Sequence, residues 1–175
     1  MKRSEFRQLA ARKILILDGA TGTELAKLGM PSGVCPELWV YEHPESICDI
    51  HRRYIAAGSD IVYAPTFGGN RCKLAEFSLA ERLPEIVTGL VKIARKNAPD
   101  ALVFGDIAPT GRFVEPYGDL PFAEAVAIFR ECAQAMVEGG VDGFAIETMM
   151  DLQEARAVVL RFRELSSLLR ALELK

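Results

Sequence analysis

Residues 139–148 have the sequence GGVDGFAIET, and residues 57–66 repeat the same design as AGSDIVYAPT. In both stretches a predicted helix ends at glycine and an aspartate follows two residues later. A short apolar run then leads to a threonine eight residues after that glycine. Two matching helix-to-strand joints indicate a repeated αβ unit. Chance similarity between two αβ loops is the alternative.

Four short apolar runs, separated by helical patterns, extend this design along the chain. Such runs suit strands that are buried on both faces, as in parallel sheets. The predicted strands are 14–17, 61–64, 101–104 and 144–146. The predicted helices are 2–12, 23–29, 44–57, 84–98, 122–139 and a last one, capped by Asp151, with Leu152, Ala155, Val159, Phe162, Leu165 and Leu169 on one face. This alternation predicts an α/β protein built of βαβ units around a parallel sheet.

The composition is typical of one globular domain. Of the 175 residues, 50% are hydrophobic and 26% are charged, which is too apolar for a disordered chain. The 21 Lys and Arg against 24 Asp and Glu give a net charge of -3. That balance lacks the basic patch typical of nucleic-acid-binding proteins, so we expect no nucleic-acid partner.

Targeting signals and cysteine spacing both favour a cytoplasmic protein. The sequence has no secretory signal and no stretch of about 18 or more apolar residues that could span a bilayer. Its four cysteines, at positions 35, 48, 72 and 132, are scattered without a CxxC pair. We expect reduced thiols, no membrane partner and no metal bound by these four cysteines.

Polar side chains follow each predicted strand: Asp18, Thr66, Asp106 and Glu147, in chain order. Because ligands of parallel α/β folds bind at the carboxyl ends of the strands, we expect these side chains to share one rim. Three carboxylates and a hydroxyl would bind a metal ion or an ammonium group such as that of an amino acid. The alternative is that each acid caps the helix after it. It is weaker for Glu147, since Asp151 already supplies a cap.

Residues 18–24, with the sequence DGATGTE, form a glycine-containing turn between the first predicted strand and the next helix. Such a turn presents backbone N–H groups to an anion such as a carboxylate or a phosphate. It lacks the GxGxxG and GxxxxGK(S/T) spacings, so nucleotide binding is not supported. Alternatively, glycine here only permits a tight turn.

The two histidines and the nearby aromatic residues favour structural roles. His51 lies within a predicted helix, and no serine or cysteine nucleophile is paired with it in the sequence. His43 precedes a proline in a predicted loop, and Trp39 and Tyr41 of the same loop are interpreted as local packing.

Five segments taken together resemble the homocysteine S-methyltransferase family, most closely the amino-terminal module of cobalamin-dependent methionine synthase. The resemblance runs from about Ile14 to about Val159, with the segments in order. They are LDGATGTEL (17–25), IHRRYIAAGSDI (50–61), TFGGNR (66–71), GDIAPTG (105–111) and GVDGFAIET (140–148).

The resemblance implies a (β/α)₈ TIM barrel in which a zinc ion, held by three cysteines, binds homocysteine as a thiolate. It also implies that Asp18, Gly19 and Glu147 lie at the homocysteine site, with Glu147 paired to the substrate ammonium. The backbone N–H groups of Ala20 and Thr21 would receive the substrate carboxylate. Thr66 and Asp106 are second-rank candidates on the same rim. Methylcobalamin is one methyl donor among several that serve relatives.

Two features depart from the family pattern. Pro65 stands where relatives often carry asparagine, which restricts the backbone before Thr66. The zinc cysteines of the family come from the second half of the barrel, and none of the four cysteines here falls on those positions. A full barrel needs roughly 250 residues. We therefore expect a barrel truncated to about its first four βα units: a helix over 1–13, the units over 14–164 and a helical tail over 165–175.

These expectations favour a homocysteine S-methyltransferase half-domain that binds the amino acid but is inactive alone, with no catalytic residue and no metal ligand of its own. Exposed sheet edges would pair with the second half of the barrel or with another copy of the chain. A non-catalytic module that self-associates through those edges is the alternative. A different barrel enzyme, using Asp18, Asp106 and Glu147 as a metal or acid–base cluster, is a third hypothesis.

Overall fold

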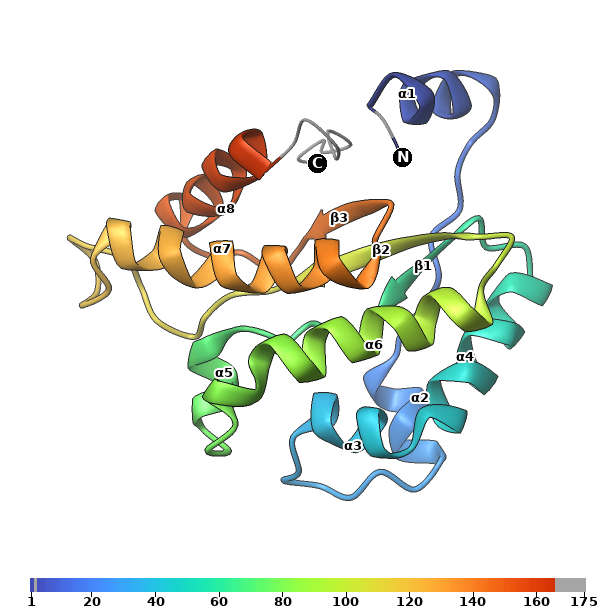
Figure 1. The fold of residues 1–175 in the computed structure, drawn as a ribbon, viewed down its shortest axis with the longest axis horizontal. Helices are drawn as coiled ribbons and strands as arrows, with labels where there is room; N and C mark the ends of the chain where they lie inside the picture. The colour runs from blue at the N-terminus through green and yellow to red at the C-terminus, as the bar shows by residue number, and fades with distance from the viewer. Residues whose placement is uncertain (2, 166–175) are drawn as a thin grey trace.

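The computed structural model describes residues 1 and 3–165 (Figure 1). None of the described helices is both long and apolar enough to cross a bilayer. The elements are α1 (Arg3–Arg12), α2 (Gly22–Lys27), α3 (Pro36–Glu42), α4 (Pro44–Ala56), β1 (Ile61–Ala64), α5 (Arg71–Ala75), the 3-10 helix η1 (Ala80–Arg82), α6 (Leu83–Asn97), β2 (Leu102–Ile107), α7 (Phe122–Gly139), β3 (Gly143–Ile146) and α8 (Leu152–Leu165).

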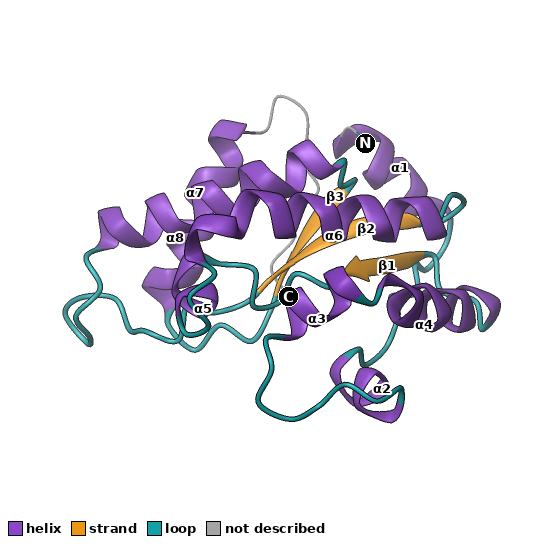
Figure 2. Ribbon diagram, turned by 60° about the horizontal axis from the view of Figure 1, so that its bottom comes forward, coloured by secondary structure: helices purple, strands orange, loops and turns teal. Residues whose placement is uncertain are grey.

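Strands β1, β2 and β3 form one parallel sheet in that order, with Tyr63 opposite Phe104. The predicted α/β fold with a parallel sheet is therefore confirmed. Helices α6 and α7 lie side by side over one face of the sheet, and α8 packs against α7 (Figures 1 and 2). The main apolar core lies between sheet and helices and includes Val62, Val87, Val91, Val103, Phe129 and Met136.

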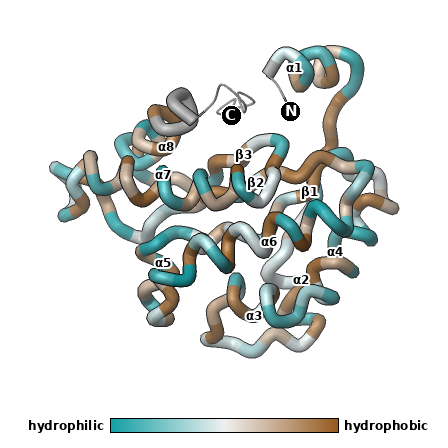
Figure 3. Tube along the Cα trace, in the orientation of Figure 1, coloured by the Kyte–Doolittle hydropathy of each residue, from teal (hydrophilic) through white to brown (hydrophobic). Residues whose placement is uncertain are grey.

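The prediction of a buried first strand over 14–17 is wrong. This segment forms only an isolated bridge, with Leu17 opposite Ile61, and the amide of Asp18 donates to the carbonyl of Ile61 at 2.9 Å. Ile14 is 89% exposed, and Ile16 and Leu17 are about half exposed. No described strand pairs with the outer edge of this segment, which follows α1 and is hydrophobic along its length (Figure 3).

The two predicted helix-to-strand joints share one geometry. Gly58 and Gly140 both have positive φ, 108° and 95°, which is the left-handed conformation that ends helices. The carboxylates of Asp60 and Asp142 each accept an N–H of the neighbouring segment at 3.0 Å, and each is paired with a cation. The repeat is therefore structural: each aspartate aligns the strand it precedes with the neighbouring segment.

Most predicted helices are confirmed, and α7 has the predicted bounds. The helices α3 and α5 were not predicted, because residues 36–42 and 71–75 are too short to show apolar periodicity. Asp151 does cap α8, since its Oδ1 accepts the amide of Gln153 at 2.8 Å. The predicted apolar face of α8 is wrong at Leu152, which is 82% exposed, and the buried residues include Glu154, Ala157 and Val158. The side chains of Phe162 and Leu165, and the predicted tail beyond 165, lie outside the described residues.

Candidate functional site

A cavity of about 570 Å³ lies at the carboxyl ends of the strands. Side chains alternate between the two faces of a strand. The residues before and after Tyr63 pack into the helix-covered core, so Tyr63 faces the cavity instead. The lining residues are Leu17, Asp18, Gly19, Ala20, Thr21, Gly22, Leu25, Pro36, Glu37, Val40, Tyr63, Ala64, Pro65, Phe67, Asp106 and Glu147. Six of the seven predicted site residues are among them, and Thr66 is not.

Asp106 is the most deeply placed predicted carboxylate, with 7% of its surface exposed. Its Oδ1 atom is buried and has no hydrogen-bond partner. Burial, together with the nearby charges of Glu147, Asp18 and Glu37, raises the pKa of Asp106 to about 8. An unpartnered acidic oxygen that faces other carboxylates is suited to a cationic ligand.

Asp18 joins the first segment to β1 at the cavity wall. Its Oδ2 accepts the amide of Tyr63 at 3.0 Å, while its buried Oδ1 lacks a partner. Burial, opposed by the backbone hydrogen bonds and helped by the charge of Glu147, raises the pKa of Asp18 to about 6. Two aspartates of the rim thus each keep one unpartnered oxygen.

The turn after Asp18 is shaped by α4. Tyr54 donates its hydroxyl to the carbonyl of Ala20 at 2.8 Å. A Cβ atom at Gly19 would lie 2.8 Å from the ring of Tyr54, so only glycine fits at this close approach. The aromatic ring therefore holds the glycine-containing turn, including Thr21, against the cavity.

Thr66 acts on the site through the backbone of Asp106. Its hydroxyl donates to the carbonyl of Asp106 at 3.0 Å and accepts the amide of Asp106 at 3.1 Å. The side chain is fully buried outside the cavity lining. The structure thus assigns Thr66 to holding β2 beside the end of β1.

Two ionisable side chains of the cavity were not predicted from the sequence. Glu37 of α3 is buried, accepts the amide of Gly68 at 2.7 Å and has a pKa raised by burial. Burial and the charges of Glu147, Asp106 and Asp18 raise the pKa of Tyr63 to about 12. Strand alternation between Tyr63 and its neighbours could have indicated that this ring faces the cavity. No comparable signal exists for Glu37, because α3 is too short to show a helical pattern.

The described cysteines do not fit the zinc site that the resemblance implies. Among the described residues, no group of three or more His, Cys, Asp or Glu is placed to hold a metal ion. All four cysteines are free thiols whose pKa burial raises, and Cys35 donates to Glu37 at 3.5 Å. A raised pKa disfavours the thiolate that binds zinc.

The histidines have the predicted structural roles. His51 is fully buried, and its Nε2 lies 3.0 Å from the carbonyl of Tyr63. Burial lowers the pKa of His51 to about 4, so the ring is neutral near pH 7. Trp39 stacks on His43 with ring centroids 4.6 Å apart, which is local packing.

The parallel sheet carries an acidic cavity at the carboxyl ends of its strands, which is the edge at which parallel α/β proteins bind their ligands. The sequence model for homocysteine S-methyltransferase matches residues 15–172. The chain belongs to the homocysteine S-methyltransferase family, as its sequence motifs predict.

Individual relatives agree with this assignment. The chain is 32% identical over 166 residues to methionine synthase of Mycobacterium leprae, which covers 87% of this chain and 14% of that protein. It is 30% identical over 175 residues to the homocysteine S-methyltransferase YbgG of Bacillus subtilis, which covers 86% of this chain and 55% of that protein. This chain thus spans about half of YbgG and a smaller share of the methionine synthase.

Solved structures show the same fold. The oxidised form of the homocysteine methyltransferase MmuM from Escherichia coli superposes with a TM-score of 0.79 at 26% identity, over 91% of this chain and 61% of that chain. Its metallated form gives a TM-score of 0.78 at 25% identity, over 91% and 62% of the two chains.

Proposed function

We propose that this chain binds the amino-acid part of homocysteine and serves its S-methylation, the last step of methionine synthesis. The observation that carries the proposal is the meeting of Asp18, Asp106 and Glu147 in one cavity. Two of these acids keep unpartnered oxygens, and no Lys or Arg is among the described residues that line the cavity. Such a site attracts an ammonium group and repels a free anion.

In the proposed binding mode, the two charged groups of the substrate contact different parts of the cavity. The ammonium group lies against Glu147, with the two aspartates beside it, and the substrate carboxylate meets the backbone N–H groups of Ala20 and Thr21. Apolar lining side chains, including Leu17, Val40 and Phe67, leave room for the methylene groups and the sulfur. Because Asp106 has a raised pKa, the ammonium would displace a proton that the acids hold in its absence.

We infer that the thiol of homocysteine is activated by groups outside the described residues, because the described cysteines do not fit a zinc site. The isolated chain is therefore expected to show little or no methyl transfer. Methylcobalamin is the donor that the resemblance to methionine synthase suggests, bound by residues elsewhere. The four free thiols suit the reducing cytoplasm.

Glu147→Gln tests the proposed ammonium site. Removing one charge from the pair should raise the Kd for L-homocysteine by about tenfold to hundredfold, since a hydrogen bond to a charged group contributes about 1.5–3 kcal/mol. The measurement is isothermal titration calorimetry under reducing conditions.

Two controls accompany this titration. 4-Mercaptobutanoate, which lacks the ammonium group, should bind weakly to both proteins, and its affinity should not fall in Glu147→Gln. Glu138→Gln on the exposed side of α7 should leave the Kd for homocysteine unchanged. Equal homocysteine affinity in wild type and Glu147→Gln would remove the basis of the proposed binding mode.

We also propose that the chain associates through its exposed sheet edge, either with a second copy or with a polypeptide that carries the rest of a barrel. The exposed Ile14, Ile16 and Leu17 beside β1 support this proposal. An unpaired apolar edge is a template for strand pairing.

Ile16→Lys tests this edge contact. Light scattering after size-exclusion chromatography should show wild-type dimers or larger species and a monomeric variant, because a charge on an edge strand blocks pairing. Leu28→Lys, at an exposed position after α2, is the matched control and should associate like wild type. A wild-type monomer at high concentration contradicts self-association.

A further inference from the structure

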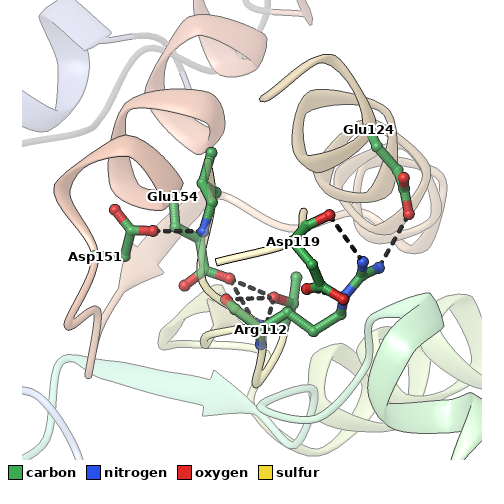
Figure 4. Close-up of polar contacts among 7 residues, drawn as sticks. Arg112, Asp119, Glu124, Asp151 and Glu154 are labelled. Carbon is green, nitrogen blue, oxygen red and sulfur yellow. Dashed lines mark hydrogen bonds and ion pairs between the residues drawn. The ribbon is translucent and has the colours of Figure 1, made fainter. Parts of the chain in front are cut away.

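The loop between β2 and α7, residues 108–121, is held by two acids at the start of α8. Oε1 of Glu154 accepts both the amide and the hydroxyl of Thr110, each at 2.7 Å. Oδ2 of Asp151 accepts the amide of Val114 at 2.7 Å (Figure 4). Both carboxylates thus accept backbone amides of the loop, one from Thr110 and one from Val114.

Glu154 is used for this contact and not for an ion pair. Only 2% of its surface is exposed, and none of the ion pairs among the described residues includes it. A buried carboxylate without a cation is costly unless its oxygens accept hydrogen bonds. The two hydrogen bonds from Thr110 meet this need, and the hydroxyl of Thr110 in turn accepts the amide of Arg112 at 3.2 Å.

These contacts connect the chain segments that carry two of the site acids. Thr110 lies four residues after Asp106, with the buried Ile107 and Ala108 between them. Asp151 lies four residues after Glu147, whose amide donates to the carbonyl of Ile107 at 3.1 Å. The segments that follow Asp106 and Glu147 are therefore bonded to each other twice: at the end of the sheet, and again where Asp151 and Glu154 bind the loop.

We propose that Glu154 and Asp151 are positioning residues that set the separation of the Asp106 and Glu147 carboxylates across the cavity. The effect on substrate binding rests on the proposed function. The separation of the two carboxylates can be tested without substrate. If the contacts to the loop are lost, β2 and β3 remain paired, while the segments after them become able to move apart. The two carboxylates then hold a ligand less tightly.

A pair of substitutions at one position separates this role from general stability. Glu154→Gln keeps an oxygen that accepts from Thr110, whereas Glu154→Met fills the same space without an acceptor. The first readout is the pKa of Asp106, measured by carbon-13 NMR titration of the side-chain carboxyl in the absence of homocysteine. The groups that face Asp106 are Glu147 and Asp18, together with Glu37 and the phenol of Tyr63.

We expect Glu154→Met to lower the pKa of Asp106 by about one unit, because the negative charge of Glu147, which raises that pKa, moves away. Glu154→Gln should leave that pKa close to the wild-type value. The second readout is the Kd for L-homocysteine, which should rise about tenfold or more in Glu154→Met and change little in Glu154→Gln, as expected for a displaced binding group.

The matched control is Glu124→Gln. The carboxylate of Glu124 of α7 pairs at 3.1 Å with the exposed side chain of Arg112 in the same loop, not with the loop backbone (Figure 4). Both readouts should remain at their wild-type values in this variant. An equal effect of Glu124→Gln and Glu154→Met would overturn the proposal, since loss of an exposed ion pair would then change the site as much as loss of the buried contact.

The outcomes are distinguishable from failure of the proposed function. If wild type does not bind homocysteine, the proposed function fails, while the titration of Asp106 still tests the positioning role. An unchanged pKa of Asp106 in folded Glu154→Met overturns that role. If Glu154→Met does not fold, Thr110→Val takes its place, because it removes the hydroxyl that donates to Glu154 and accepts the amide of Arg112. A lowered pKa of Asp106 supports the proposal and an unchanged pKa overturns it.

Discussion

Asp106→Asn is expected to gain stability relative to wild type as the pH rises from 5 to 8, by about 4 kcal/mol over this range. Burial and neighbouring acids raise the pKa of Asp106 to about 8 in the folded state, against 3.8 as the ordinary value. Asparagine has nearly the same shape and carries no proton that titrates in this range. We expect the same variant to lose homocysteine binding, so that this substitution raises stability and lowers function.

The sign follows from proton linkage. Between pH 3.8 and 8 the folded state holds a proton on Asp106 that the unfolded state has lost. The contribution of Asp106 is therefore complete below pH 3.8 and is lost as the pH rises toward 8, at about 1.4 kcal/mol for each pH unit. The variant lacks this loss, so the difference between the two proteins grows with pH.

Other groups do not obscure the difference. The lowered pKa of His51, about 4, gives stability that is complete above pH 6.5 and lost as the pH falls toward 4. The raised pKa of Asp18, about 6, acts in the opposite direction between pH 3.8 and 6. Both groups are present in wild type and variant, so their contributions largely cancel in the comparison.

Urea unfolding at pH 5, 6.5 and 8 measures the effect. Asp119→Asn serves as the control, because Asp119 is exposed and lies outside the cavity. Its stability should follow the wild-type pH dependence. A constant difference between wild type and Asp106→Asn over the three pH values would mean that Asp106 is ionised throughout and that the cavity does not hold a proton.

Gly139→Ala is expected to destabilise the protein by about 2–3 kcal/mol, although alanine favours helices over glycine by about 1 kcal/mol. Gly139 is the last residue of α7 and faces α6. A Cβ atom there would lie 2.5 Å from Cβ of Val91 and 3.1 Å from the carbonyl oxygen of Thr88. Both atoms are close to the α6 backbone, so the two helices would have to separate.

Thermal and urea unfolding compare this variant with Gly22→Ala. A Cβ atom at Gly22, in α2, would meet nothing within 4 Å, so that variant should be as stable as wild type or slightly more stable. Equal stability of Gly139→Ala and Gly22→Ala would show that α6 and α7 adjust to the added methyl group without loss of packing.

Helices with a long apolar stripe were accessible from the sequence, and short elements were not. The stripe of α6, with Ile86 and Leu90 fully buried, repeats over four turns, and this periodicity alone identifies the helix. Helix α3 has only seven residues, beginning at Pro36. It is stabilised by the burial of Val40 against α4 and α6, a contact between distant parts of the chain.

The segment 14–17 illustrates the opposite error. A run of four apolar residues predicts a strand, but it does not state whether other strands flank it on both sides. The structure gives it one neighbour, β1, and leaves Ile14 and Ile16 exposed. Whether an apolar segment is buried depends on which other elements pack against it, and the local sequence pattern does not show this.

The sequence by itself determined that an α/β chain with repeated joints would bring Asp18, Asp106 and Glu147 to the same rim, because parallel strands share a direction and acids follow three of the apolar runs. Only the tertiary structure decided that Glu37 and Tyr63 complete the cavity, that Thr66 bonds to the backbone instead of facing it, and that Glu154 holds the loop after Asp106. The physical reason is that hydrogen bonds and desolvation act between atoms that are close in space. The sequence orders residues only along the chain.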